Sequence, residues 1–225
     1  MSFLENTRSP AGLGGKLMVR MMNVGHRALA CWGLRFLLLS ADAKVLDCGC
    51  GGGANIRTLL KKCPQGIVKG VDISDVSVTT ARRVNRSAIA DSRCAVWQGS
   101  VDELIFAADW FDAVTAFETV YFWPDLPKSF REIRRVLRPG GVLVYDGVVA
   151  AGERDAATVA RARELGNAVQ AAPAREEFEA MMARIGFARP DYYEESNVRP
   201  ETGYKGGFEV PVAETGEDVR FVKTT

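Results

Sequence analysis

The segment VLDCGCGGGANIRTLL, residues 45–60, decides the fold. A short apolar run leads into four closely spaced glycines, and the glycines lead directly into a helix-forming stretch. Glycines let the chain turn tightly and approach a ligand without a Cβ in the way, and the first turn of the following helix offers free N–H groups. The segment therefore predicts a strand, a loop and a helix that together bind a nucleotide-like ligand.

The alternation of strand and helix continues along the chain. Five strand-length apolar runs are expected at residues 44–47, 67–72, 94–98, 112–117 and 141–146. Three helical stretches separate them, at residues 54–62, 75–90 and 128–137. This order predicts an α/β fold with a mostly parallel sheet and helices on both faces.

The two ends of the chain add helices and strands to this core. We expect one or two helices within residues 11–39 and two more at residues 156–170 and 174–185. A sixth strand is expected at residues 189–194, and a seventh at either 208–212 or 219–223. The expected organisation is a single domain, residues 1–225, with N-terminal cap helices in 1–40, a cofactor-binding core in 44–146, and the last helices and strands in 150–225.

Composition excludes several classes of protein. The chain has 225 residues, of which 47% are hydrophobic and 25% charged, and its formal net charge is +1. Such a balance is typical of a globular domain and argues against charge-driven binding to nucleic acid or to an anionic membrane. Five cysteines show no pairing framework, and no apolar run is long enough to span a membrane. We therefore expect a cytoplasmic monomer or homodimer.

Two carboxylates decide between the ligands that the glycine loop allows. Gly49-x-Gly51-x-x-Ala54 also satisfies the dinucleotide fingerprint, and Asp72 ends the next strand, where it can accept hydrogen bonds from ribose hydroxyls. Asp47 lies two residues before the first glycine, where its charge would repel a pyrophosphate and attract an amine or a sulfonium. This charge favours S-adenosylmethionine over NAD.

Four further motifs follow in order, and with them the chain resembles a known family. They are VDIS at 71–74, GSVDELIF at 99–106, FDAVTAFETVYFWPD at 111–125 and LRPGG at 137–141. Together with the glycine loop they resemble the class I S-adenosylmethionine-dependent methyltransferases, and within them the small-molecule branch of the ubiquinone and menaquinone methyltransferases. The resemblance implies a Rossmann-like fold with a mostly parallel seven-stranded sheet.

The resemblance also implies which residues bind the cofactor. They are Asp47, Gly49, Cys50, Gly51, Gly53, Asp72, Ile73, Ser100, Val101 and Phe117. The chain departs from the family pattern at Ser100, which replaces the acid that accepts from the adenine amino group, and at Ile105, which replaces a proline. A serine hydroxyl still accepts a hydrogen bond, so contact with adenine is retained as an expectation.

Three residues are candidates for catalysis. Glu118 and Tyr121 follow the fourth strand, in the loop that overlies the methyl donor, and His26 is the only histidine. Phe122 and Trp123 either wall the acceptor pocket or pack the loop against the N-terminal helices. The loop has no Asn/Asp-Pro-Pro-Tyr tetrad, which argues against methylation of amide nitrogen or of a nucleobase amine.

The remaining conspicuous residues have simpler explanations. Cys48 and Cys50 supply only two ligands, so no metal site is expected. The arginines within residues 82–86 and 131–138 are interpreted as solvated helix faces. The expected function is methyl transfer from S-adenosylmethionine to a small organic acceptor. The alternatives are a catalytically silent S-adenosylmethionine-binding protein and an NAD-dependent oxidoreductase.

Overall fold

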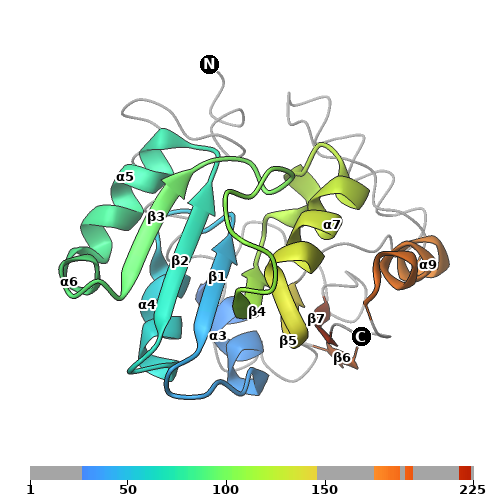
Figure 1. Cartoon of the computed structure of the whole chain (residues 1–225), viewed down its shortest axis with the longest axis horizontal. Helices are drawn as coiled ribbons and strands as arrows, with labels where there is room; N and C mark the ends of the chain where they lie inside the picture. The colour runs from blue at the N-terminus through green and yellow to red at the C-terminus, as the bar shows by residue number, and fades with distance from the viewer. Residues whose placement is uncertain (1–26, 146–174, 188–190, 195–217, 224–225) are drawn as a thin grey trace.

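A seven-stranded sheet forms the centre of the molecule (Figure 1). The computed structural model describes residues 27–145, 175–187, 191–194 and 218–223. The strands are β1 (Lys44–Cys48), β2 (Ile67–Asp72), β3 (Cys94–Gln98), β4 (Phe111–Ala116), β5 (Leu137–Tyr145), β6 (Asp191–Glu194) and β7 (Asp218–Lys223). Their order is β3-β2-β1-β4-β5-β7-β6. The neighbours from β3 to β5 are parallel, and β7 is antiparallel to both β5 and β6.

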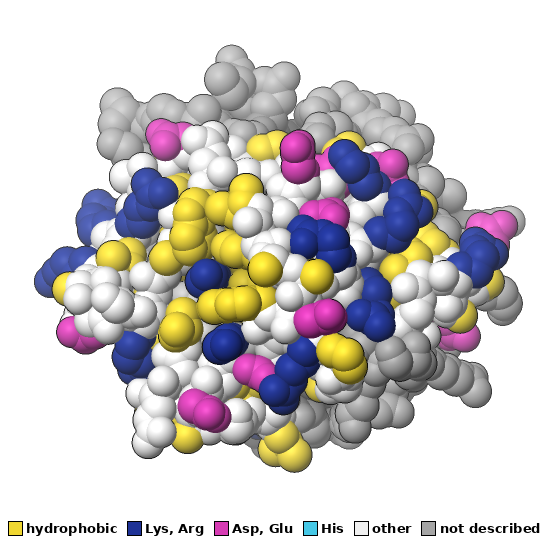
Figure 2. All heavy atoms as spheres, viewed as in Figure 1, with side chains coloured by type: hydrophobic (Ala, Val, Ile, Leu, Met, Phe, Trp, Pro, Cys, Tyr) yellow, Lys and Arg dark blue, Asp and Glu magenta, His cyan; other side chains and the backbone are white. Residues whose placement is uncertain are grey.

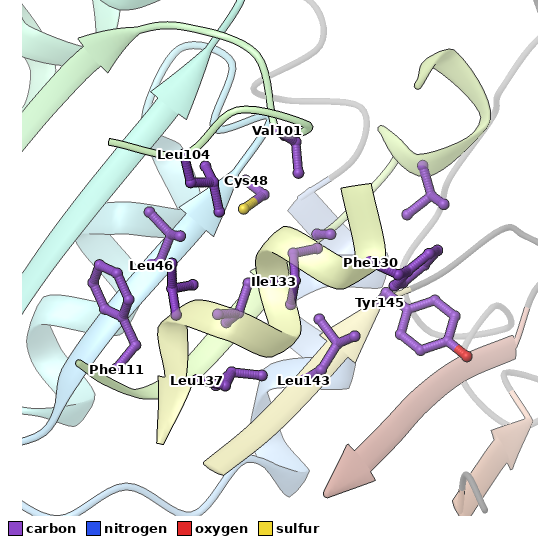
Figure 3. Close-up of a cluster of buried hydrophobic side chains, with 14 of the residues drawn as sticks. Leu46, Cys48, Val101, Leu104, Phe111, Phe130, Ile133, Leu137, Leu143 and Tyr145 are labelled. Carbon is purple, nitrogen blue, oxygen red and sulfur yellow. The ribbon is translucent and has the colours of Figure 1, made fainter. Parts of the chain in front are cut away.

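Helices cover both faces of the sheet. They are α3 (Arg27–Phe36), α4 (Ala54–Lys62), α5 (Asp75–Val84), α6 (Arg86–Ala90), the short 3-10 helix η1 (Val120–Phe122), α7 (Leu126–Val136) and α9 (Arg175–Ile185). Alternate residues of each strand point to opposite faces. Val45 therefore packs in the core beneath α3, α4 and α5. Leu46 packs in the second core with Ile133 of α7 and Phe178 of α9, part of which is drawn in Figure 3.

The expected strands and helices of the core are confirmed, with two local corrections. A single helix at 75–90 was wrong, because the chain breaks at Asn85 between α5 and α6. The Asn85 side-chain amide donates to the carbonyls of Gly53 and Ala81, which fixes the break against the glycine loop. LRPGG is not a simple turn either, since Leu137 already pairs with Phe111 before the register shifts and pairing resumes at Val142.

The ends of the chain agree with expectation where they are described. The helix expected at 174–185 is α9, the sixth strand is β6, and the second alternative for the seventh strand is β7. Of the expected N-terminal helices only α3 is described. Residues 156–170 and 208–212 lie outside the described part of the chain.

The segment between β3 and β4 contains no helix, and α7 holds it in place. The Arg135 guanidinium donates to the carbonyls of Leu104 (2.8 Å) and Phe106 (2.7 Å), and Glu132 accepts from the Leu104 N–H. One face of the sheet near β2 and β3 therefore stays open, and apolar side chains gather there among lysines and arginines (Figure 2). Lys69 lies there, with its Nζ 3.9 Å from the centre of the Trp110 ring.

Candidate functional site

A pocket lies at the carboxyl edge of the parallel strands, where the loops after β1, β2, β3 and β4 meet. Ligands of open α/β sheets bind at this edge. The residues that line the pocket come from all four loops, and they are Gly49, Asp72, Ile73, Gly99, Ser100, Val101, Thr119, Phe122, Trp123 and Pro124. Five of the expected cofactor-binding residues are among them: Gly49, Asp72, Ile73, Ser100 and Val101.

Asp72 connects the end of β2 with the glycine loop. One carboxylate oxygen accepts from the Gly51 N–H (2.8 Å) and the other from the Ser74 N–H (2.9 Å). Burial raises the pKa of this carboxyl, and the backbone N–H groups of Ser74 and Gly51 partly oppose that rise. The Ser77 side chain hydrogen-bonds to this carboxyl as well. Three donors leave about one of the four acceptor positions of the carboxylate for a hydroxyl at the pocket wall.

Two glycines are required by close approach between loops. Gly49 has φ +67°, and a Cβ at this position would overlap the Thr119 side chain. Gly53 has φ +79°, and its Cβ would overlap Ala81 and the Asn85 amide. A residue with a side chain would therefore strain the backbone and separate the loops. Gly51 lies between them and contributes its N–H to Asp72.

Asp47 lies in the protein interior rather than on the pocket wall. Only 1% of the residue is exposed. Its Oδ1 accepts from the Thr115 hydroxyl at 2.7 Å, and its Oδ2 has no hydrogen-bond partner among the residues that the structure describes. Burial, with a smaller contribution from the charge of Asp72, raises the pKa of Asp47 to about 7. An unpaired buried carboxylate is costly, and a nearby cation would stabilise it.

The loop after β3 carries a carboxylate, Asp102, next to the pocket residue Ser100, although Asp102 itself does not line the pocket. Ser100 replaces the family's acid, and the structure places Asp102 beside it. The Ser100 side chain hydrogen-bonds to Asp102 and lowers the pKa of that carboxyl, with help from Lys128, whose Nζ lies 3.2 Å away. Ile73 lies at the pocket with half of its surface exposed, while Val101 is buried and packs toward α7 (Figure 3). This side of the pocket combines an apolar wall with a polar edge.

The loop after β4 closes the other side of the pocket. Trp123 lines it, donates from Nε1 to Thr119 Oγ1 (3.2 Å), and packs its ring against Phe130 at 5.4 Å between centroids. Trp123 therefore lines the pocket and packs against α7, rather than against α3, the N-terminal helix that the structure describes. Phe122 lines the pocket as well.

Neither Glu118, an expected catalytic residue, nor Phe117, an expected cofactor-binding residue, is among the residues that line the pocket. Glu118 is partly exposed and has φ 54°, a left-handed conformation that is rare for a residue with a side chain, but it is not among the pocket-lining residues. Phe117 is buried in the core beneath α3 and α4, so its side chain does not reach the pocket. The Tyr121 side chain and His26 lie outside the described part of the structure.

The cysteines of the glycine loop are buried thiols. Cys50 is 5% exposed and Cys48 is fully buried, and burial raises the pKa of both well above its usual range. Protonated thiols are poor metal ligands. The described residues contain no group of three or more potential metal ligands. None of the described helices is long and apolar enough to cross a membrane.

Sequence reasoning missed four residues of the site: Gly99, Thr115, Thr119 and Pro124. Thr115 carried a signal, because a hydroxyl interrupts the apolar strand DAVTAF. Its meaning depends on the pairing of Asp47 with Thr115, which only the sheet register supplies. Thr119 gave no such signal, since its role comes from contact with a glycine 70 residues earlier in the chain.

Comparison with known proteins assigns the core to a family. Residues 46–145 match the family described as "Methyltransferase domain". This segment is similar to a methyltransferase domain. It spans the glycine loop, Asp72 and the loop after β4, so the family match and the pocket coincide.

Two proteins that are similar to this chain in sequence are named as methyltransferases. The methyltransferase GfsG of Streptomyces halstedii is 37% identical over 117 residues, which are 52% of this chain and 42% of that protein. The 24-methylenesterol C-methyltransferase 2 of Oryza sativa is 30% identical over 149 residues, 64% of this chain and 41% of that protein. The chain thus spans about two fifths of the length of these two relatives.

A solved structure shares the fold of the methyltransferase domain and of the segments around it. It is a putative methyltransferase in complex with the Haloferax volcanii Trm112 methyltransferase activator. It superposes with a TM-score of 0.74 at 19% identity and covers 92% of this chain and 93% of its own. At this identity the likeness establishes the fold alone.

Proposed function

We propose that this protein transfers a methyl group from S-adenosylmethionine to a small organic acceptor and releases S-adenosylhomocysteine. The observation that carries the proposal is the pair of carboxyl groups beside the glycine loop. Asp72 stands at the pocket wall, where a ribose would be bound, and Asp47 keeps one buried oxygen unpaired. Asp47 suits a ligand that carries an ammonium group and opposes one that carries a pyrophosphate.

Different residues of the pocket and its surroundings bind different parts of S-adenosylmethionine. S-adenosylmethionine supplies a methyl group on a sulfonium, which an acceptor atom takes by in-line displacement. Asp72 accepts hydrogen bonds from the ribose, Ile73 and Val101 enclose the adenine, and Ser100 with Asp102 forms the polar edge beside it. Asp47 balances the charge of the ammonium group. Such a reaction mainly requires the protein to hold both partners close and to exclude water.

The acceptor that we propose is a small molecule with a substantial apolar part. Phe122, Trp123 and Pro124 form the wall after β4, and a sterol methyltransferase is among the similar proteins. A quinone, as in the ubiquinone and menaquinone methyltransferases, fits the same description. No sequence feature favours nucleic acid as the acceptor.

Glu118 is our candidate for orienting the acceptor or accepting its proton. Its strained backbone at φ 54°, directly after β4, supports this role, because strain of this kind is retained where function requires it. Tyr121 and His26 are proposed as further members of the acceptor site on sequence grounds. We also propose a cytoplasmic monomer or homodimer, a setting that five free thiols support.

Ligand-dependent melting tests the proposal against its alternatives. The chain is heated with S-adenosylhomocysteine or with NADH, beside the variants Asp47→Ala and Asp91→Ala, the latter a change of an exposed carboxylate at the end of α6. We expect S-adenosylhomocysteine to raise the melting temperature of the wild type and of Asp91→Ala, and to have little effect on Asp47→Ala. Stabilisation by NADH alone would instead identify an oxidoreductase.

A second assay separates an enzyme from a silent cofactor-binding protein. The chain is incubated with methyl-labelled S-adenosylmethionine and a panel of sterols, quinones and small amines. Label transferred to an acceptor by the wild type but not by Asp47→Ala supports the enzyme. Cofactor binding without transfer to any member of a broad panel would favour the silent protein.

A further inference from the structure

Thr115 is placed to control the state of Asp47. β4 lies beside β1, and Asp47 and Thr115 are direct partners in the register of the two parallel strands. Both residues are buried, at 1% and 0% exposure. Thr115 donates its hydroxyl proton to Asp47 Oδ1 at 2.7 Å, and it is the one side chain in the described part of the structure that hydrogen-bonds this carboxyl.

The other neighbouring strand leaves no room for a second donor. Gly70 of β2 is the register partner of Asp47 on that side and has no side chain. A Cβ at Gly70 would overlap Ile56 Cδ1 at 2.7 Å and Cys50 Sγ at 2.9 Å, so α4 and the glycine loop fill the space above it. Asp47 is therefore enclosed between the glycine loop and the sheet. Its Oδ2 has no hydrogen-bond partner among the described residues.

We propose that Thr115 is a positioning residue for cofactor binding, because its hydroxyl fixes one oxygen of Asp47 and leaves the other without a partner beneath the glycine loop, where its negative charge attracts the ammonium group of S-adenosylmethionine or S-adenosylhomocysteine. This inference rests on the proposed function and extends it to a residue outside the pocket wall. It also predicts that cofactor binding near neutral pH releases a proton from Asp47.

The charges around Asp47 explain why cofactor binding should release its proton. The titratable groups that couple to it are Asp72 at the end of β2, Cys48 of β1, Cys50 of the glycine loop and Cys94 of β3, and none is a cation. Burial and Asp72 favour the protonated carboxyl, and the Thr115 hydrogen bond favours the ionised one. An arriving ammonium group adds a positive charge next to Asp47 and shifts this balance toward the carboxylate.

Substitution of Thr115 can shift the equilibrium between protonated and ionised Asp47 with little change in side-chain volume. Thr115→Val removes the hydroxyl and Thr115→Ser retains it. Thr80→Val makes the same chemical change at a buried position on α5, outside the contacts of Asp47. The affinity for S-adenosylhomocysteine is measured by titration calorimetry from pH 6 to pH 8.5, in buffers of different ionisation enthalpy. This design counts the protons released on binding.

We expect the wild-type affinity to increase as pH rises through about 7, with proton release largest below that pH. Thr115→Val should bind about fivefold to tenfold more weakly at pH 7, recover toward pH 8.5, and release more protons at pH 7, because the loss of one donor raises the pKa of Asp47. Thr115→Ser and Thr80→Val should follow the wild type. Asp47→Asn should bind weakly at every pH and release no proton.

One result would overturn the proposed role of Thr115 alone, and another would overturn the proposed function as well. If Thr115→Val and the wild type share one pH profile while both bind S-adenosylhomocysteine, the role of Thr115 is wrong and the proposed function stands. If the wild type does not bind S-adenosylhomocysteine at any pH, both are wrong. A uniform loss of affinity in Thr115→Val, without a shift along the pH axis, would assign Thr115 a structural role only.

Discussion

At the residue scale, the buried Asp47 couples stability to pH in the free protein. Its pKa is about 7 when folded and near 3.8 when unfolded. Between these values the folded state holds a proton that the unfolded chain has released. The contribution of this group to stability therefore falls as pH rises from about 4 to about 7, and it is constant above that range. Under the proposed function, the ammonium group of the bound cofactor offsets this loss of stability.

Asp47→Asn is expected to remove that dependence. Without cofactor, the variant should unfold at higher urea concentration than the wild type at pH 8, by up to about 4 kcal/mol in the free energy of unfolding, and the difference should largely vanish at pH 4. Urea titrations of both proteins at the two pH values measure it. A variant that is less stable than the wild type at pH 8 would contradict the assignment of an unpaired buried carboxyl.

Two glycines of the glycine loop provide a matched comparison. Gly49→Ala and Gly51→Ala place an alanine at φ +67° and +49°, which costs about 1–2 kcal/mol in either case. At Gly49 the new Cβ also overlaps Thr119, whereas at Gly51 it meets nothing within 4 Å. We therefore expect Gly49→Ala to lower the unfolding free energy more than Gly51→Ala, as measured by urea denaturation. Thr119→Gly should partly rescue Gly49→Ala, and equal costs at the two glycines would rule out this contact.

The residues of the site were predictable to unequal extents. Gly49 and Asp72 carry local signals, because a glycine loop and an acid at a strand end are required by backbone geometry and ribose chemistry. Thr115 and Thr119 act through partners far away in the chain, which a local pattern does not reveal. Phe117 ends in the core beside β4 and is not among the pocket-lining residues, which the local pattern did not show.

At the element scale, α7 holds the loop that carries two of the pocket-lining residues. Arg135 and Glu132 hold residues 104–106, which follow the pocket residues Ser100 and Val101. A charged donor bonded to two carbonyls is worth about 1.5–3 kcal/mol per hydrogen bond. The helix thus orders a segment that has no secondary structure of its own.

Arg135→Met tests this support, with Arg131→Met as its control on an exposed position of the same helix. We expect Arg135→Met to lower the free energy of unfolding by about 2–3 kcal/mol and to weaken S-adenosylhomocysteine binding several-fold. Amide hydrogen exchange should accelerate within residues 99–110, while Arg131→Met stays close to the wild type. Unchanged exchange in that segment would show that α7 does not hold it.

Helices and strands were predicted well where the spacing of nearby apolar residues defines them. They were predicted poorly where a contact with a distant part of the chain sets their boundary. The strands of the core follow from short apolar runs, and α9 ends at Ile185, directly before Gly186, which has φ 98°. The break at Asn85 depends on its hydrogen bond to Gly53, which lies 32 residues earlier. LRPGG looked like a turn because proline and glycine usually end regular structure, yet Leu137 already pairs with β4.

At the scale of the whole molecule, the last described strand joins the sheet between two earlier ones. β7 pairs with β5 over Val142–Tyr145 and with β6 on its other side. Deletion of residues 218–225 would expose the edge of β5 and detach β6 from the sheet. We expect a clear loss of melting temperature and a tendency to aggregate through the exposed edge.

Deletion of residues 224–225 alone is the control, and it should leave melting unchanged. Thermal denaturation and light scattering measure the two effects. S-adenosylhomocysteine should raise the melting temperature of any folded fraction of the longer deletion, since the pocket lies at β1 to β4. A truncated chain that melts like the wild type would mean that β7 contributes little to the sheet.

The buried thiol of Cys50 can be used to measure local opening of the glycine loop. The sulfur lies beneath the glycine loop, in contact range of Gly70, and burial keeps it protonated and unreactive. An alkylating reagent reaches it only when that loop lifts, so the rate of alkylation measures the frequency of opening. A bound ligand that holds the loop in place will slow this reaction, so mass spectrometry of the alkylated protein reads occupancy without a labelled ligand.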